Sequence, residues 1–322
     1  RVRARHRFAL TGTPMENRLS ELWSIFDFLM PGLLGTRDSF AKRFESPVEH
    51  AEGDSAARLQ ALVSPFVLRR VKEEVVADLP EKIEDTVMAQ LTGEQRKLYL
   101  ANQDRIAQQV QHREASEFKK NKLKVLAELT KLRQICCDPH LHYADYKAGS
   151  AKLDTCMELV HGALDGGHRI LLFSQFTGML DIIGKRLAKE DIAFLKLTGA
   201  SSKESRAKMV AQFQAGEVPV FLISLKAGGV GLNLTAADVV IHYDPWWNVA
   251  AQDQATDRAH RIGQQHTVTV YKLIAKDTIE ERIMQMQESK RDLVNSVLDG
   301  DGISSALFTR EDVLALLGGD GR

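Results

Sequence analysis

The chain has 322 residues, a length that predicts about two domains, each large enough to bury its own core. Lysine plus arginine and aspartate plus glutamate both total 43, so the formal net charge is zero. This balance excludes a uniformly basic nucleic-acid binder and an acidic solvating tail, so any phosphate site must be a local concentration of charge. Hydrophobic residues make up 44% and charged residues 27%, which is typical of a globular protein.

The cysteines and the apolar runs bear on the cellular compartment. Cys136, Cys137 and Cys156 cannot build a disulfide framework, and the adjacent pair lacks the spacing of a zinc site. Such cysteine usage is typical of a reducing cytosol or nucleus. The apolar runs are too short to span a membrane, and the charged first residues are unlike a signal peptide. We therefore expect a soluble intracellular protein without a metal site.

The first part of the chain is predicted to contain a strand and a helix. Residues 8–11 have the composition of a short strand that enters a Gly/Pro turn. Apolar residues recur at helical spacing from Leu22 to Leu29, and Pro31 and Gly32 end that helix. Because a strand needs neighbours and no initiating Met is present, we expect the chain to begin inside a domain.

Residues 36–150 are predicted to be mostly helical and strongly charged. Residues 83–91 alternate enough to form a strand, and residues 94–136 have helical periodicity. The helical stretch carries a basic cluster, which consists of Lys119, Lys120, Lys122, Lys124, Lys131 and Arg133. The cluster is interpreted as a solvated helix face, and a flank that contacts nucleic acid is the alternative.

Strands alternate with helices from residue 150 onward. Short apolar runs occur at residues 169–173, 194–197, 219–223, 238–243 and 268–274. This alternation predicts βαβ units and a parallel sheet that is covered by helices on both faces. Capping boxes at Ser201/Glu204 and Thr278/Glu281 predict two helix starts, and a last helix is expected to end at Gly318.

The ends of these strands are the expected ligand site. In an open parallel sheet, ligands bind beyond the carboxyl ends of the strands. Hydroxyls, glycines, an amide and a lysine follow four of the runs, at residues 174–177, 198–199, 224–231 and 244–248. Glycine N–H groups can cradle phosphate oxygens. The glycines at 228, 229 and 231 can equally be turn residues, but the convergence of four loops on one edge favours a ligand site.

Residues 248–263 give the sharpest functional signal. Asn248 can cap a helix that ends at Gly263, which places Gln254, Arg258 and Arg261 on one face. Two guanidiniums on one face are costly to bury without anions. They suit the charge that develops on a transferring γ-phosphoryl group, which is the arginine-finger role. The alternative is an ion pair with a neighbouring aspartate.

Several segments resemble motifs of the Swi/Snf family of DNA translocases, within helicase superfamily two. The matching segments are residues 10–17 (LTGTPMEN) for motif III, 170–177 for motif IV, 224–235 for motif V and 254–264 (QATDRAHRIGQ) for motif VI. Residues 66–70 (FVLRR) and 244–248 (DPWWN) resemble further family hallmarks. The resemblance extends from residue 1 to about residue 298, and the order of four long motifs makes chance implausible.

The resemblance implies an α/β fold with a RecA-like parallel sheet, a helical insertion and a remnant of a first RecA-like lobe. Residues 1–75 are expected to hold that C-terminal remnant and linker helices, and residues 76–150 a linker strand and a helical protrusion. Residues 151–285 are expected to form the second RecA-like lobe, and residues 286–322 the C-terminal helices.

The resemblance also implies an ATP-driven motor that tracks along double-stranded DNA. A G-x-x-x-x-G-K-[ST] phosphate loop and an acidic Mg²⁺-binding box are both absent from this sequence, and in the family they lie upstream of motif III. ATP and Mg²⁺ are therefore the implied cofactors, with the Mg²⁺ ligands in an upstream lobe. We expect the chain to carry half an ATPase site and to be inactive alone.

Family roles carry over to individual residues. Arg258 and Arg261, with Gln254 nearby, are implied to be catalytic. Gly229, Gly231 and Asn233 are implied to approach the nucleotide. The residues implied to contact DNA are Ser174, Gln175, Phe176, Thr198, Gly199, Ser224, Lys226, Trp246 and Trp247. Thr11, Gly12 and Thr13 are implied to couple the lobes. For each tryptophan the alternative is burial between the last strand and the motif VI helix.

The implied partners are double-stranded DNA, the first RecA-like lobe, and a DNA-bound protein such as RNA polymerase; no membrane is involved. A non-catalytic DNA- or protein-binding module without motor activity is the alternative function. A strand-separating helicase is disfavoured by the tracking habit of the family. The compact helical insertion is similar to that of bacterial members, which implies a bacterial cytoplasm and association with the nucleoid; a eukaryotic chain would be nuclear.

Overall fold

The computed structural model describes residues 4–11, 19–45, 55–68, 79–111, 115–228, 232–246, 249–286 and 310–318. The chain divides into two compact units: residues 1–75 with 247–250 and 286–307, and residues 76–246 with 251–285 and 308–322. We call them the small unit and the sheet unit. The predicted domain boundaries at residues 75, 150 and 285 stay predictions.

The small unit is helical in its described part. Its helices are α1 (Leu19–Leu29), α2 (Arg37–Phe40) and α4 (Ser55–Val63), with a π-helical turn at Ala41–Glu45 and a 3₁₀ turn at Ser64–Phe66. Helix α1 buries Leu22 and Phe26 and is followed by Gly32 at φ 91°, which confirms the predicted helix and its end. The predicted strand at residues 8–11 is wrong, because these residues are irregular and no described strand pairs with their N–H and C=O groups.

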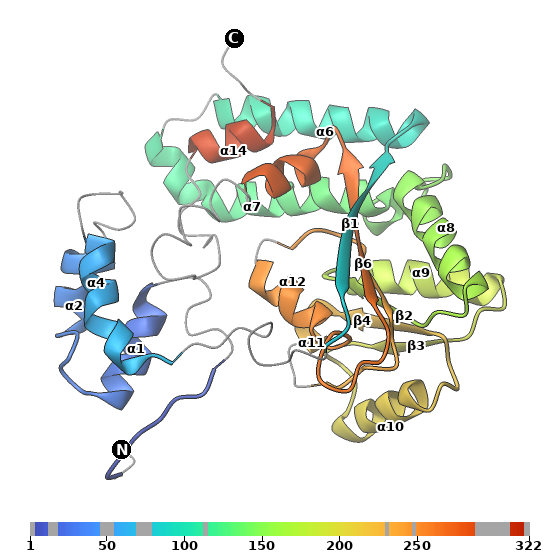
Figure 1. The fold of residues 1–322 in the computed structure, drawn as a ribbon. Coiled ribbons are helices and arrows are strands. Elements are labelled where there is room, and N and C mark those ends of the chain that lie inside the picture. Colours follow the sequence, from blue (N-terminus) through green and yellow to red (C-terminus); the bar gives the residue numbers. More distant parts are fainter. Residues whose placement is uncertain are drawn as a thin grey trace. The chain divides into compact units, whose positions relative to one another are not determined.

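A six-stranded parallel sheet organises the sheet unit (Figure 1). The strands are β1 (Lys82–Gln90), β2 (Ile170–Ser174), β3 (Phe194–Leu197), β4 (Val220–Ser224), β5 (Val239–His242) and β6 (Val268–Lys276), in the spatial order β1-β6-β5-β2-β4-β3. All six predicted strands of this unit are confirmed. The strands β2, β4 and β5 are buried along their whole length, which explains their uninterrupted apolar sequences.

Strand β1 pairs with β6, a strand that is far away from it in the sequence. It pairs with β6 over nine residues, from Lys82↔Val268 to Gln90↔Lys276. The strand was expected only as a linker, and the structure shows that it is the edge of the sheet beside β6. Glu84 bonds to Lys272 across this ladder at 2.6 Å. The linker segment is therefore part of the rigid sheet unit from residue 82 onward.

Helices cover both faces of the sheet, which confirms the predicted α/β architecture. The helices of this unit are α6 (Gly93–Gln111), α7 (Ala115–Cys137), α8 (Ala151–Asp165), α9 (Thr177–Lys189), α10 (Lys203–Gln214), α11 (Leu225–Gly228), α12 (Val249–Thr256), which starts at the unit boundary, and α14 (Arg310–Leu316). Leu172 and Leu222 face α8 and α9, whereas Phe173 and Phe221 face α10 and α12. No helix of the described residues is long and apolar enough to cross a bilayer.

The helix caps correct one prediction and confirm another. Ser202, and not Ser201, caps α10, because its Oγ accepts the N–H of Ser205 at 3.2 Å, while Ser201 Oγ accepts the N–H of Thr198. Thr278 caps the helix that begins at residue 279, since its Oγ1 accepts the N–H of Glu280 at 3.2 Å. The expected end of α14 is also confirmed, with Gly318 at φ 80°.

Candidate nucleotide and nucleic-acid interface

The two arginines of the motif VI segment lie in a turn and not on a helix. Helix α12 ends at Thr256, so the helix predicted to reach Gly263 is too long. Residues 257–263, which we call the arginine turn, leave the helical path because the carbonyl oxygen of Arg258 accepts the N–H of Leu234 at 2.9 Å. Gly263, at φ 101°, ends the turn in a backbone conformation that favours glycine.

Arg258 is a buried cation without an ion pair in the described part of the chain. The residue is 9% exposed, and its Nε has no hydrogen-bond partner there. Burial and the neighbouring Arg261 lower the pKa of Arg258, and Asp257 opposes them. The Arg261 Nη1 donates to the carbonyl oxygen of Leu232 at 3.5 Å. A buried guanidinium beside a second, half-buried one fits a multiply charged anion, such as the terminal phosphate of a nucleotide.

Two buried side chains hold the arginine turn in place. His260 Nε2 donates to the carbonyl oxygen of Pro80 at 2.7 Å. Gln264 Nε2 donates to the carbonyl oxygens of Ala237 at 2.8 Å and Ala259 at 3.1 Å, while its Oε1 accepts the N–H of Gln265 at 2.8 Å. The turn is therefore fixed to the segment before β1 and to the segment before β5. Such fixing keeps charged groups in place without reorganisation when a ligand arrives.

The predicted site residues that follow β4 differ in burial. Ser224 is buried, and its hydroxyl has no hydrogen-bond partner among the described residues. Lys226 lies on the short helix α11, in place of the first part of the expected glycine loop, and its side chain is outside the described part. Asn233 is exposed. Residues of the predicted site that lie outside the described ranges are Gly12, Thr13, Gly229, Gly231, Trp247 and the cap residue Asn248.

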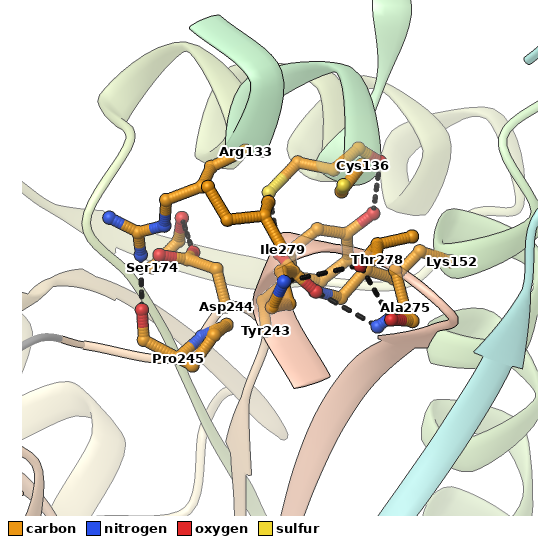
Figure 2. Close-up of polar contacts among 12 residues, drawn as sticks. Arg133, Cys136, Lys152, Ser174, Tyr243, Asp244, Pro245, Ala275, Thr278 and Ile279 are labelled. Carbon is orange, nitrogen blue, oxygen red and sulfur yellow. Dashed lines mark hydrogen bonds and ion pairs between the residues drawn. The ribbon is translucent and has the colours of Figure 1, made fainter. Parts of the chain in front are cut away.

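The motif IV residues are tied to Asp244, as Figure 2 shows for Ser174. Ser174 Oγ donates to Asp244 Oδ1 at 2.5 Å, and both residues are buried. Gln175 donates to Asp244 Oδ2 through its side-chain Nε2 at 2.5 Å and its backbone N–H at 3.3 Å. The N–H of Phe176 bonds back to Ser174 Oγ at 3.1 Å. Asp244 thus joins the loop after β2 to the loop after β5, and Gln175 and Phe176 remain half-buried at the surface.

The other expected contact residues have mixed surroundings. Thr198 is half-buried and Gly199 is exposed, in the turn between β3 and α10. Trp246 is half-buried against the core between the sheet and α12. Its backbone N–H donates to Gln252 Oε1 at 3.4 Å. Gln254 lies half-buried on α12, and Thr11 is exposed in the small unit. The packing of Trp246 on the core agrees with the alternative interpretation, in which the tryptophan is buried behind the last strand. Part of its side chain nevertheless stays accessible to solvent.

Sequence reasoning missed two residues at this edge. Asp244 was noted only as part of a hallmark, although a carboxylate directly after a strand can accept bonds from the next loop. Arg133 was grouped with a solvated lysine cluster, but it is 1% exposed and donates to Gln175 Oε1 at 3.2 Å. Its position four residues after the buried Leu129 was the available signal, because such spacing puts Arg133 on the buried face of α7.

A buried ion pair lies next to the site. Lys152 Nζ and Glu280 Oε2 are 2.5 Å apart, and both side chains are fully buried. The same Glu280 oxygen accepts the N–H of Ala275 at 2.9 Å. Lys152 Nζ also lies 5.4 Å from the ring centre of Tyr243, and Figure 2 shows Lys152 beside Ala275 and Thr278. The network joins α8 to the end of β6 and the helix that follows it.

The cysteines and acidic groups give no metal centre within the described ranges. Cys136, Cys137 and Cys156 are free and buried, and burial raises the pKa of Cys156 to about 12. No group of three or more His, Cys, Asp or Glu side chains in the described residues could hold a metal ion.

Comparison with known proteins connects this geometry to a family. An SNF2-related domain matches residues 1–141, and a helicase conserved C-terminal domain matches residues 151–263. The solved C-terminal domain of the Sulfolobus solfataricus SWI2/SNF2 ATPase is 33% identical, with a TM-score of 0.60 over 73% of this chain and 98% of that one. The chain belongs to the SWI2/SNF2 ATPase family. The expected RecA-like fold of the sheet unit is thereby confirmed.

Longer SWI2/SNF2 proteins match nearly the whole chain. The Sulfolobus solfataricus SWI2/SNF2 ATPase core in complex with dsDNA is 36% identical, with a TM-score of 0.62 over 95% of this chain and 65% of that one. The putative ATP-dependent helicase/translocase YwqA of Bacillus subtilis is 41% identical over 97% of this chain. The chain spans only 29–34% of the length of three curated bacterial relatives that match it.

Proposed function

We propose that this chain is the C-terminal half of an ATP-dependent double-stranded-DNA translocase or remodeller, and that it supplies arginine fingers and DNA-backbone contacts. The observation that carries the proposal is the arginine turn. Arg258 is buried beside Arg261 without an ion pair among the described residues, and repulsion from Arg261 adds to burial in lowering the pKa of Arg258. An incoming anion would relieve that repulsion.

The arginine turn is assigned to the nucleotide. ATP, bound with Mg²⁺ whose ligands we place in the first RecA-like lobe, would supply the phosphoryl group whose hydrolysis drives the motor. Arg258 and Arg261 would stabilise charge on the terminal phosphate, because a guanidinium presents a planar fork of donors that matches phosphate oxygens. Gln254, four residues before Arg258 in the sequence, would orient the attacking water or the phosphate. Gly229, Gly231 and Asn233 would approach the nucleotide from the loop after β4.

The loops after β2, β3, β4 and β5 are assigned to the DNA backbone. Gln175, Phe176 and Trp246 keep accessible surface at the carboxyl edge of the sheet, and Thr198, Gly199 and Lys226 belong to the same edge. Ser174 is fully buried, so we assign it to holding the loop through Asp244. The dsDNA complex of the Sulfolobus relative supports this assignment. Thr11, Gly12, Thr13 and Trp247 keep their implied roles as proposals.

The remaining proposals concern partners and place in the cell. The first RecA-like lobe is the required protein partner, because the phosphate loop is absent from this sequence. A DNA-bound protein such as RNA polymerase is the proposed obstacle that the motor displaces. Similarity to the Bacillus protein supports a bacterial cytoplasm, with the motor on nucleoid DNA.

Turnover measurements test the motor proposal. ATP hydrolysis is measured for the 322-residue chain alone and for the same chain completed with its first lobe, each with and without double-stranded DNA. DNA-stimulated turnover is expected only for the completed motor. Turnover by the chain alone would contradict the half-site proposal, and a completed motor that binds DNA without hydrolysing ATP would favour the non-catalytic binding module.

A salt titration tests the DNA proposal on the chain alone. Binding through few phosphates predicts weak, sequence-independent affinity and a log–log salt slope of about −2 to −5. A strong preference for one sequence over shuffled controls would contradict backbone contacts.

A further inference from the structure

Arg133 brings a guanidinium from α7 to the place where two proposed DNA-contacting loops meet. Its Nη1 donates to Gln175 Oε1 at 3.2 Å, and its Nη2 donates to the carbonyl oxygen of Pro245. The guanidinium carbon lies 5.7 Å from the ring centre of Phe176. Figure 2 shows the side chain of Arg133 extending from α7 to Pro245. The Arg133 side chain therefore contacts Gln175 and Phe176 in the loop after β2 and the backbone of Pro245 in the loop after β5.

The burial of Arg133 argues against direct contact with DNA. The residue is 1% exposed, so a phosphate cannot reach its guanidinium without rearrangement of the loops around it. Burying a guanidinium is costly unless its N–H groups are bonded, and here Nη1 and Nη2 donate to the loops themselves. The two loops therefore stabilise the buried guanidinium, and the guanidinium fixes the positions of the two loops.

The amide of Gln175 is oriented from both sides. Its Oε1 accepts from Arg133, and its Nε2 donates to Asp244 Oδ2 at 2.5 Å. Asp244 in turn accepts from Ser174. Without Arg133, the bond to Gln175 Oε1 is lost, and the Gln175 amide can rotate about χ3. The carbonyl oxygen of Pro245, which leads into Trp246, then keeps only the bond from Gln175 Nε2 at 3.3 Å.

We propose that Arg133 is a positioning residue that couples the helix pair α6–α7 to DNA binding, by holding Gln175, Phe176 and Pro245 in the arrangement that contacts the DNA backbone. The inference rests on the proposed function, since that is where both loops are assigned to DNA. It places one control of the DNA-contacting edge on α7.

Binding of double-stranded DNA to the 322-residue chain tests the inference. Arg133→Met keeps the aliphatic volume and removes the donors, and we expect about tenfold weaker binding, since bonds to a charged group are of that strength. Arg133→Lys keeps the charge and one donor, and an intermediate loss is expected. Lys131→Met removes the same charge from the same helix, two residues away, and should change the affinity less than about twofold.

The salt slope separates positioning from direct contact. A residue that neutralises a phosphate shifts the log–log slope by about one when it is removed. Because Arg133 is buried, the slope for Arg133→Met should stay that of the wild type while the affinity falls. A slope that is shallower by about one would overturn the positioning role. So would an affinity loss no greater than that of Lys131→Met.

A double variant tests the route through Gln175. Gln175→Ala and Arg133→Met should lose affinity less than additively when they are combined, because both act on one contact. Additive losses would overturn the coupling. If Arg133→Met unfolds, as judged by its melting temperature, the Arg133→Lys and Gln175→Ala pair carries the same cycle.

The wild-type measurement distinguishes the two proposals. If the wild-type chain binds DNA and the Arg133 variants bind equally well, only the inference fails. If the wild-type chain does not bind DNA, the proposed DNA contacts fail and the inference falls with them.

Discussion

The imidazole of His260 donates a hydrogen bond from Nε2 to the carbonyl oxygen of Pro80, 2.7 Å away, although 180 residues separate the two in sequence. Pro80 precedes β1, whose ladder with β6 starts at Lys82 and Val268. His260 lies inside the arginine turn, two residues after Arg258. The segment that leads into the sheet unit is therefore bonded directly to the turn that carries the proposed arginine fingers.

Replacing His260 should impair ATP turnover more than DNA binding. His260→Ala removes the bond to Pro80 and frees one side of the arginine turn. A misplacement of about 1 Å can cost about 10²-fold in rate, so we expect turnover of the completed motor to fall between about 10- and 100-fold. DNA affinity of the chain should stay near that of the wild type, because the DNA loops are held by other bonds. His266→Ala, at an exposed histidine nearby, is the control. Equal losses in both variants would contradict the positioning of the turn by His260.

Removing either arginine should abolish turnover without loss of DNA binding. For Arg258→Ala or Arg261→Ala in the completed motor, we expect turnover to fall by about 10³- to 10⁵-fold, as for other arginine fingers. An exposed ion pair contributes only about 0–1 kcal/mol and cannot explain such a loss. Arg186→Ala, which removes a surface arginine bonded to Glu190, is the matched control and should keep wild-type turnover.

Lys226 should show the opposite profile. Lys226→Ala is expected to weaken DNA binding and to recover turnover when DNA is raised to saturation, because the residue is assigned to the DNA edge. Turnover is measured against DNA concentration for all variants. Arginine variants that excess DNA rescues would show that the arginine turn faces DNA and not the nucleotide.

Stability should decrease with falling pH because of a buried neutral histidine. Burial, together with the nearby Lys272, lowers the pKa of His242 from 6.5 to about 3. Its Nε2 lies 2.8 Å from Thr256 Oγ1, and its Nδ1 has no partner among the described residues. The unfolded chain takes up a proton below pH 6.5, and the folded chain does so only near pH 3. Folding stability is therefore fully present above pH 6.5 and should drop by about 2 kcal/mol by pH 5.

Urea unfolding at pH 7.5, 6 and 5 checks this expectation. His242→Gln should flatten the pH dependence, and the exposed His266→Gln should leave it unchanged. Glu84 is a separate contribution at lower pH: burial raises its pKa, but bonds from Lys272 and Lys82 outweigh burial and hold the pKa at about 2. Its stabilisation is lost only below about pH 4.5, outside the measured range. An unchanged slope in His242→Gln would show that another group causes the acid sensitivity.

The strands of the sheet could be predicted because each central strand is a short apolar run. The buried runs at β2, β4 and β5 have no polar interruption, and the intervening helices have one apolar face. The place of β1 could not be predicted, since its ladder partner β6 is far away in sequence and its exposed residues do not reveal which strand they join. Local pattern fixes the element, and long-range pairing fixes its position.

The candidate site was only partly accessible to sequence reasoning for a similar reason. Arg258 and Arg261 stood out because a helix through both would place two guanidiniums on one face, which suits a phosphate. Their helix ended early because the carbonyl oxygen of Arg258 bonds to Leu234, which is a tertiary contact. The proposed role of His260 rests on its bond to Pro80, and that of Arg133 on its bond to Gln175. Each bond joins residues that are far apart in the sequence, so local spacing could not predict it.

The buried pair of Lys152 and Glu280 gives the last prediction. Removing one partner leaves an uncompensated charge in the core, so Lys152→Met or Glu280→Met should each lower the free energy of unfolding by about 3–5 kcal/mol. Replacing both with Lys152→Met and Glu280→Met should cost much less than the sum, because no charge remains buried. Lys196→Met, which breaks the exposed pair with Asp181, should cost about 0–1 kcal/mol.

Chemical denaturation of the four variants separates a tight ionic pair from ordinary packing. If the pair acts electrostatically, the double variant is more stable than either single variant that leaves a charge. If the two single losses simply add, each side chain contributes only through its own packing, and the ionic interpretation is wrong. Because Glu280 also accepts the N–H of Ala275, the double variant should retain a small loss from that unsatisfied group.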